Sequence, residues 1–225
     1  MKLAIYDFDG TLCDQETIPF LIEFYRKNKY SYTKLGQFYF RMIGLTFKYK
    51  LKLDSSLDKE KYRATAATTF MYLFENKKKE DIVDFFSDSA AELVKYFNPK
   101  VVESISEKKE QGYHIVVCSG ANTLLLNEIA KHIELDEVIG TELSFLEDGS
   151  YDFDSRMFVT TGKNKPIALL ERFKDKEVDW VNSYAYGDSY YDYDFMNLTG
   201  NPVAVNPDEG LRDITKEKGW EILGE

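Results

Sequence analysis

Tyr6-Asp7-Phe8-Asp9-Gly10-Thr11-Leu12 directly follows a short, mostly apolar segment, residues 2–5, at the start of this 225-residue chain. The apolar segment predicts a buried strand, and the glycine predicts that the chain turns immediately after it. Both aspartates would then lie at the carboxyl end of a strand, where open α/β sheets bind their ligands. Two carboxylates held this close resist joint ionisation unless a cation lies between them or one is protonated. The stretch therefore predicts either a metal site or a solvated acidic turn.

The overall composition is that of a soluble, acidic protein. The net charge of −10 disfavours non-specific binding to nucleic acid and to anionic membranes, so we expect no nucleic-acid partner and no membrane insertion. No apolar run reaches the roughly 18 residues of a membrane span, and no secretory signal precedes the first acidic residues. The two cysteines, Cys13 and Cys118, lack metal-site spacing and are expected to be free thiols. These features predict a cytoplasmic protein.

Helical periodicity dominates the chain from residue 14 to residue 97. Apolar residues recur at helical spacing in four segments, at about residues 18–25, 33–49, 59–76 and 80–97. In the second segment, one face gathers apolar residues: Leu35, Phe38, Tyr39, Met42 and Ile43. In the fourth segment, we expect the following residues to face inward: Ile82, Phe85, Phe86, Ala90 and Leu93. Asn98 and Pro99 end the last helix. The sequence therefore predicts an all-helical block, rich in Tyr and Phe, inserted just after the first strand.

From about residue 98 onward, predicted strands alternate with predicted helices. Nearly continuous apolar runs indicate buried strands at residues 114–118, 138–140, 181–186 and 202–206, and residues 141–158 indicate a β-hairpin. Alternation of this kind predicts an α/β fold with a parallel sheet, helices on both faces and right-handed crossovers.

Polar residues follow the ends of the predicted strands. Asp7, Asp9, Ser119 and Asp188 each come directly after a strand, and parallel strands place such positions on one edge of the sheet. Carboxylates from two strand ends, those of Asp7 and Asp188, can hold a divalent cation. Because no His or Cys accompanies them, Mg²⁺ is favoured over zinc. The sequence predicts that these residues converge on one crevice.

The same edge offers groups that bind an anion. Ser119 and Gly120 provide a hydroxyl group and backbone N–H groups at the start of a helix, and Lys165 provides a fixed positive charge. Together with a metal ion, these groups would neutralise a tetrahedral dianion such as phosphate. One aspartate can then serve as the nucleophile and its neighbour as the general acid and base.

Four motifs in this order resemble those of the haloacid dehalogenase superfamily: Asp7-Phe8-Asp9-Gly10-Thr11-Leu12, Ser119-Gly120, Lys165 and Gly187-Asp188-Ser189-x-x-Asp192. The resemblance spans residues 7 to about 205. It implies a Rossmann-like core and a Mg²⁺-dependent aspartyl-phosphate mechanism. Asp7 would be the nucleophile and a metal ligand. Asp9 would protonate the leaving oxygen and then activate water, with its backbone carbonyl on the metal.

The resemblance also implies roles for the remaining motif residues. Thr11 and Ser119, with Gly120, would bind the phosphoryl group, and Lys165 would stabilise it. Asp188 would hold Mg²⁺, and Asp192 would complete the metal site by orienting the metal's waters. Lys165 is preferred over the nearby Lys163 because it directly precedes the apolar face of its helix, as the family lysine does. Dehalogenating members lack an acid at the position of Asp9, so phosphoryl transfer is favoured over dehalogenation.

The position of the helical insertion resembles the phosphoserine phosphatase-like branch of the superfamily. The resemblance implies a catalytic core of residues 1–13 and 98–225 and a helical cap of residues 14–97. Glu16 stands where that branch contacts the amine of its substrate, although it could equally be an acid that complements a helix dipole. Arg63 and Arg41 are the candidates for a group that holds the substrate carboxylate. Tyr191 departs from the branch, which usually has Asn there.

The motifs therefore predict a cytoplasmic, Mg²⁺-dependent phosphatase that acts on a small phosphorylated metabolite, with a phosphoserine-like compound as one substrate. Transfer of the phosphoryl group to an alcohol is an alternative to hydrolysis. Phosphocholine, phosphoethanolamine or a lipid phosphate is an alternative substrate, given the aromatic cap. A non-catalytic binding module would be expected to carry a broken motif, and none of the four is broken.

Overall fold

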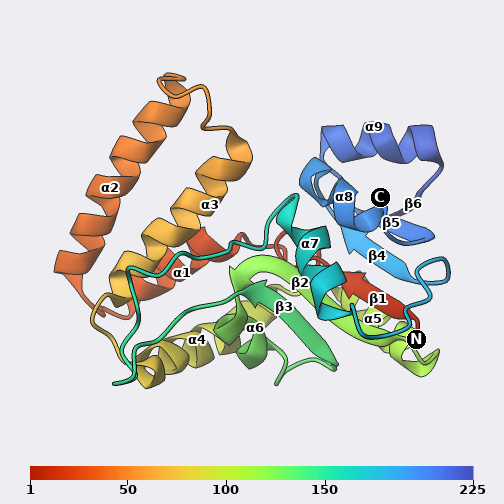
Figure 1. The fold of residues 1–225 in the computed structure, drawn as a ribbon, viewed down its shortest axis with the longest axis horizontal. Helices are drawn as coiled ribbons and strands as arrows, with labels where there is room; N and C mark the ends of the chain where they lie inside the picture. Colours follow the sequence, from red (N-terminus) through yellow and green to blue (C-terminus); the bar gives the residue numbers. More distant parts are fainter. Residues whose placement is uncertain (225) are drawn as a thin grey trace.

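Six strands form one parallel sheet at the centre of the computed structural model, which describes residues 1–224 (Figure 1). Their order across the sheet is β3-β2-β1-β4-β5-β6. The strands are β1 (Leu3–Tyr6), β2 (His114–Asn122), β3 (Glu137–Thr141), β4 (Tyr184–Gly187), β5 (Asn201–Val205) and β6 (Glu221–Leu223). The order changes direction at β1, whose neighbours are β2 and β4. This confirms the α/β architecture predicted from the sequence.

Helices cover both faces of the sheet because successive side chains of each strand point to opposite sides. Leu3 and Ile5 of β1 pack in a cluster with residues of α7 (Asn164–Arg172), α8 (Tyr193–Met196) and α9 (Glu209–Lys218). Ala4 and Tyr6 belong to the opposite cluster, with residues of α5 (Pro99–Glu110) and α6 (Thr123–Ile129). β1 is fully buried as a result, and this fixes the position of the acidic stretch that follows it.

The segment between β1 and α5 is helical, as the periodicity predicts. It contains α1 (Thr17–Lys27), α2 (Tyr32–Lys50), α3 (Lys59–Phe70) and α4 (Lys79–Leu93), with short 3-10 turns at Met71–Phe74 and Val94–Tyr96. Ser31 and Asp58 cap α2 and α3 by accepting hydrogen bonds from backbone N–H groups. α2 and α3 lie side by side and project away from the sheet (Figure 1). None of the helices in residues 1–224 combines the length and apolarity that a membrane span requires.

The predicted apolar face of α2 and the predicted hairpin at residues 141–158 are each only partly ordered by packing or pairing. On the apolar face of α2, Leu35 and Phe38 are buried, whereas Tyr39 and Ile43 are 44% and 68% exposed. α3 and the turn at Met71–Phe74 pack against α2, and only part of the apolar surface of α2 is covered.

Residues 141–158 contain the predicted hairpin in a short form: Phe145 and Tyr151 form an antiparallel bridge, and backbone hydrogen bonds join Leu146 to Ser150 and Asp152 to Ser144. The rest of this segment is an extended loop. Ser150 of this segment also forms an antiparallel backbone bridge with Lys78, which directly precedes α4.

β2 continues four residues beyond the apolar run that predicted it. Its pairing with β3 is irregular between Cys118 and Asn122, where the register shifts. Ser119 and Gly120 lie within this irregular stretch, directly ahead of α6. The irregularity therefore places a hydroxyl group and backbone amides at the sheet edge, close to the end of β1.

Candidate active site

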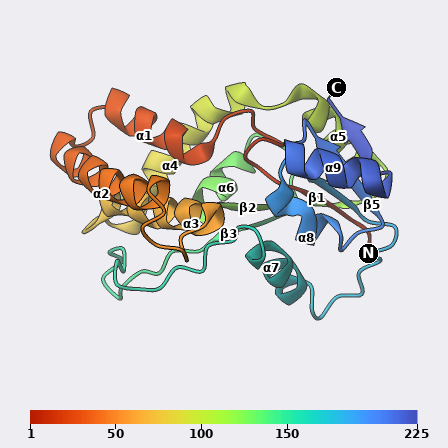
Figure 2. The same ribbon diagram turned by 90° about the horizontal axis from the view of Figure 1, so that it is seen from above.

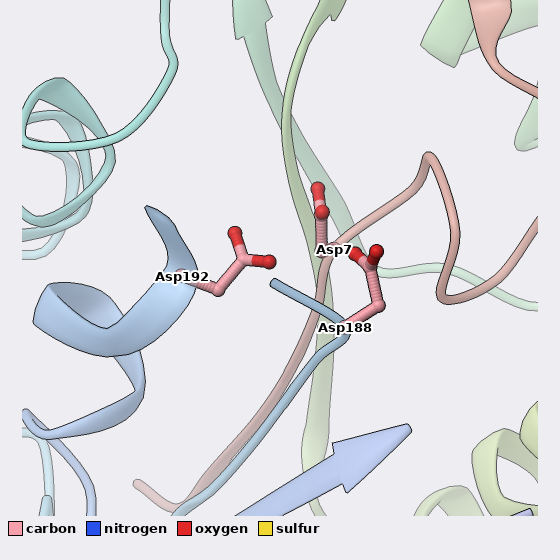
Figure 3. Close-up of side chains that lie close together, drawn as sticks. All are labelled: Asp7, Asp188 and Asp192. Carbon is pink, nitrogen blue, oxygen red and sulfur yellow. The ribbon is translucent and has the colours of Figure 1, made fainter. Parts of the chain in front are cut away.

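Three carboxylates meet at the carboxyl edge of the sheet. Asp7 follows β1, Asp188 follows the adjacent β4, and Asp192 lies in the short turn that leads into α8. One oxygen from each of the three lies within 4.8 Å of the others. Asp7 and Asp188 extend side by side, and the carboxylate of Asp192 points toward them (Figure 3). The sequence places Asp7 and Asp188 far apart, and the parallel pairing of their strands brings them together.

Gly10 allows the chain to turn closely over Asp188. Its φ is +80°, a conformation that non-glycine residues rarely adopt. A Cβ atom added at Gly10 would lie 2.4 Å from Oδ2 of Asp188. The glycine is therefore required both by the backbone conformation and by the space beside the carboxylate.

Lys165 is the cation at the centre of this cluster. Its Nζ lies 2.7 Å from Oδ1 of Asp7 and 2.5 Å from Oδ1 of Asp192, and its side chain is buried. Asp192 also accepts hydrogen bonds from the backbone N–H and the hydroxyl of Ser189. Lys163 is exposed, so of the two lysines considered from the sequence it is Lys165 that reaches the site.

The electrostatics of the cluster suit a bound divalent cation. Burial, and then the neighbouring carboxylate of Asp192, raise the pKa of Asp7 well above its usual value and that of Asp188 to about 7. Burial alone would lower the pKa of Lys165, but the carboxylates of Asp192 and Asp7 outweigh it and raise that pKa. Three carboxylates thus share a small volume with one ammonium group. An oxygen-only ligand set with excess negative charge fits Mg²⁺.

Asp9 has different surroundings from Asp7, although only one residue separates them. Its Oδ1 accepts hydrogen bonds from the backbone N–H of Thr17, at 3.1 Å, and from the Thr17 hydroxyl. Burial raises the pKa of Asp9 to about 6, although the hydrogen bonds from Thr17 act in the opposite direction. A carboxyl group with a pKa near neutrality can both donate and accept a proton at physiological pH.

The predicted phosphate-binding residues are distributed around the same cluster. Ser119 and Gly120 line the cavity in front of the carboxylates, and Ser119 is buried. Thr11 is also buried, but it does not line the cavity; its hydroxyl donates to Oδ1 of Asp188 at 3.4 Å. The structure therefore brings Ser119 to the site directly and Thr11 to a position beside the Asp188 carboxylate.

A cavity of about 500 Å³ extends from these residues toward the helical segment. Its base is polar, and its walls are largely apolar. The apolar side chains come from α1, α2, α3, α4 and neighbouring turns: Ile18, Leu21, Met42, Ala66, Phe70, Met71 and Phe86. The cavity therefore lies between the sheet edge and the inserted helices, with the carboxylate cluster at its base.

Charged residues of the helical segment line the same cavity. Glu16 and Arg63 line it and form an ion pair in which Nη2 and Oε1 are 3.1 Å apart. Glu16 immediately precedes α1 and makes no side-chain capping hydrogen bond. The guanidinium of Arg63 lies 6.0 Å from the ring centre of Tyr191. Arg41 stacks instead on Tyr72, and it is not among the residues that line the cavity.

Two residues of the site were not found from the sequence. Thr17 lies outside the four motifs, yet it holds the carboxylate of Asp9. Asn122 lines the cavity, and its buried Nδ2 has no hydrogen-bond partner within residues 1–224. An unpaired buried donor beside a cavity is unfavourable in isolation and can be satisfied by a ligand. The serine-glycine turn that precedes Asn122 was the signal that could have identified it.

A family model described as "haloacid dehalogenase-like hydrolase" matches residues 4–197. A histidinol-phosphatase from Neisseria meningitidis is 27% identical over 150 residues, which are 64% of this chain and 67% of the relative. The phosphoserine phosphatase SerB1 from Mycobacterium tuberculosis is 53% identical over 94 residues, which are 42% of this chain and 30% of the relative. The chain thus spans about two thirds of the first relative and less than a third of the second.

The fold has a close counterpart among solved structures. A protein of unknown function from Bordetella pertussis Tohama I superposes with a TM-score of 0.82 at 18% sequence identity. The superposition covers 99% of this chain and 98% of the other. The arrangement of sheet and inserted helices is therefore shared over the whole chain.

Proposed function

This chain belongs to the haloacid dehalogenase-like hydrolases, and we propose that it hydrolyses a small phosphomonoester with Mg²⁺, through a phosphorylated Asp7. The observation that supports this most is the cluster at the end of β1, where Asp7 contacts Lys165 and faces Asp188 at the base of a cavity. Relatives named as phosphatases support the same class of reaction. In the proposed division of the chain, residues 14–97 act as a cap over this site.

Asp7 and Asp9 have distinct roles in the proposed mechanism. An oxygen of Asp7 attacks phosphorus, the bond from phosphorus to the ester oxygen breaks, and Asp9 donates its proton to the departing alcohol. Asp9 then removes a proton from water, and the resulting hydroxide releases inorganic phosphate and regenerates Asp7. The raised pKa of Asp9 supports both proton transfers. Thr17 holds the Asp9 carboxyl group in position.

Neutralisation of the phosphoryl charge comes from several groups. Asp7, Asp188 and Asp192, with the backbone carbonyl of Asp9, would hold Mg²⁺, which supplies positive charge at the phosphoryl oxygens. Lys165 stabilises the same charge. Its contact with Asp192 keeps its ammonium group in place, so Asp192 acts on the lysine as well as on the metal site. In this proposal Ser119 and Gly120, which line the cavity, bind the remaining phosphoryl oxygens, and Thr11 acts by holding the Asp188 carboxylate.

Metal binding provides the first test. Removing divalent cations with a chelator should abolish hydrolysis of an aryl phosphate, and Mg²⁺ should restore it. Because the metal relieves repulsion among buried carboxylates, Mg²⁺ should also raise the melting temperature. Asp188→Asn should remove both the activation of hydrolysis by Mg²⁺ and the rise in melting temperature with Mg²⁺. Without metal and at neutral pH, the variant should be more stable than the unmodified protein by about 2–4 °C, since one of three crowded carboxylates is gone.

The matched control is Asp194→Asn, which changes an exposed aspartate in α8. Its activity and its thermal shift with Mg²⁺ should equal those of the unmodified protein. A chelator-resistant enzyme, or an Asp188→Asn variant that still responds to Mg²⁺, would contradict the proposed metal site.

The substrate is proposed to carry a cationic nitrogen near the phosphate ester. Serine phosphate, histidinol phosphate, phosphoethanolamine and phosphocholine share a nitrogen two carbons from the ester oxygen. Glu16 lies on the cavity wall without a capping role and can bind such a nitrogen. A substrate carboxylate would then meet Arg63, the present partner of Glu16. Asn122 offers an additional donor.

Substrate comparison tests this assignment. Glu16→Gln should lower kcat/KM for phosphoethanolamine and serine phosphate by about fivefold or more, since an ionic contact worth about 1 kcal/mol is lost. Hydrolysis of propyl phosphate, which has no charged nitrogen, should not change. If both kinds of substrate are affected equally, or neither is affected, Glu16 does not bind the amine.

A lipid phosphate is the second candidate substrate. The apolar walls of the cavity, which include Met42, Phe70 and Phe86, favour a lipid phosphate because a small amino alcohol is too short to cover their apolar surface. For such a substrate, kcat/KM for alkyl phosphates would rise with chain length as each methylene leaves water. The same assays therefore distinguish the two substrate classes.

A further inference from the structure

One face of α2 is apolar and exposed to solvent. Phe40, Ile43, Phe47 and Leu51 are 80%, 68%, 59% and 54% exposed, and they recur every three to four residues. We call these four residues the α2 outer face. α2 lies at the edge of the molecule farthest from the sheet, as both views show (Figures 1 and 2). A helix that is apolar on two sides is usually covered on both, so this face indicates an interaction surface.

The surroundings of the α2 outer face are strongly basic. Residues 24–53 contain eight of the 29 Lys and Arg residues of the chain and none of its 39 Asp and Glu residues. Three of these eight, Arg26, Lys27 and Lys34, form ion pairs with Glu23 or Glu75, which lie outside this range. Lys48, Lys50 and Lys52 are exposed and flank the apolar residues at the end of the helix. A locally cationic, apolar face on a protein with a net charge of −10 is complementary to an anionic surface.

We propose that the α2 outer face docks on an anionic phospholipid bilayer. Aromatic and aliphatic side chains on one stripe, flanked by lysines, are the features of helices that lie in the plane of a membrane interface. The apolar side chains would enter the boundary between headgroups and acyl chains. Lys48, Lys50 and Lys52 would contact the anionic headgroups. The acidic net charge had argued against such binding, but the acidic residues lie outside residues 24–53.

A second copy of the chain is a less suitable occupant. Symmetric pairing through the α2 outer face would place the same surface on both partners. The basic residues of the two copies would then face one another without any carboxylate from residues 24–53 to neutralise them. Gly36 and Gly44 of α2 have nothing within 4 Å of a Cβ atom added to them, so the helix surface is open there. A bilayer covers an open, shallow surface of this kind without needing a complementary pocket.

Vesicle sedimentation tests the proposal with the full chain. The protein should bind vesicles of equimolar phosphatidylcholine and phosphatidylglycerol, and binding to phosphatidylcholine alone should be at least tenfold weaker. Phe40→Ser combined with Phe47→Ser should lower binding more than tenfold, and Lys48→Glu combined with Lys50→Glu should do the same. Val181→Ser is the matched control. Val181 is an apolar residue that is 76% exposed and lies outside the inserted helices, so its substitution should not affect binding.

Activity and oligomeric state complete the test. None of the four substituted residues of α2 lines the active-site cavity, so hydrolysis of a soluble aryl phosphate should be unchanged in each variant. This readout separates the docking surface from the proposed reaction. Failure of the unmodified protein to bind anionic vesicles would overturn the proposal. Vesicle binding that persists after the Phe40 and Phe47 substitutions would also overturn it. The same holds if vesicles do not bind and the substitutions instead disrupt a stable dimer or release an acidic protein partner.

Discussion

Asp7→Asn is expected to lower the rate of phosphate release by about four orders of magnitude or more, because it removes the nucleophile. An amide oxygen is a poor nucleophile and cannot form the phosphorylated intermediate. The substitution also removes the negative charge that Lys165 contacts at 2.7 Å and that the metal site requires. The loss should therefore appear with every substrate, including aryl phosphates whose leaving groups need no proton.

The measurement is steady-state hydrolysis with Mg²⁺, together with mass spectrometry of the intact protein quenched in acid during turnover. The unmodified chain should carry one phosphoryl group, and the variant should carry none. Asp7→Ala repeats the test with a side chain that cannot convert back to aspartate. Asp14→Asn, at an exposed position a few residues away, is the control and should retain full activity. Hydrolysis at more than a small fraction of the normal rate in both Asp7 variants would exclude Asp7 as the nucleophile.

The convergence of Asp7, Ser119 and Asp188 could be predicted because a parallel sheet imposes it. Once the apolar runs are identified as strands, parallel pairing puts their carboxyl ends on one edge, whatever their separation in sequence. The register between β1 and β4 shows the same constraint: Tyr6 pairs with Tyr186, one and two residues before the two aspartates. Because the strands are short, continuous apolar runs, the positions of their carboxyl ends can be identified in the sequence itself.

Contacts between the inserted helices and the sheet edge could not be predicted in the same way. The hydrogen bonds from Thr17 to Asp9, and the contact of Arg63 with Glu16, depend on how α1 and α3 are oriented over the sheet. No pairing register fixes that orientation, because helix packing depends on side-chain shape along the whole contact. Roles that involve both parts of the chain, including substrate recognition, are therefore the least accessible from sequence.

The two sides of α2 illustrate a different limit. Its sequence contains apolar residues at helical spacing on more than one face, so periodicity alone does not say which stripe is buried. Leu35 and Phe38 are buried, whereas Ile43 is largely exposed. The selection depends on α3, which covers one side of α2. The apolar residues of α2 that α3 leaves uncovered do not stabilise the fold, and they are the ones that indicate an interaction with another surface.

Asp9→Asn is expected to separate the two chemical steps that are proposed for Asp9. With an aryl phosphate the leaving group needs little protonation, so formation of phosphorylated Asp7 should be only modestly slowed. Release of phosphate requires a base to activate water, so this step should be slowed by about 10²–10⁴-fold. The phosphorylated enzyme should therefore accumulate. Phenol release should show a burst of about one equivalent per site followed by a slow steady state.

The structure supports this separation because the carboxyl group of Asp9 is not part of the Asp7, Asp188 and Asp192 cluster and is held by Thr17. Asparagine can keep the hydrogen bonds from Thr17 through its side-chain oxygen, so the substitution should change proton transfer and leave the position of the side chain unchanged. Thr17→Val is the companion variant: it removes the hydroxyl donor and should slow both steps to a smaller extent. An Asp9→Asn variant without a burst, with both steps slowed equally, would show that Asp9 does not act as the base. A variant with normal turnover would remove Asp9 from the mechanism, because no other proposed role requires an ionisable group at that position.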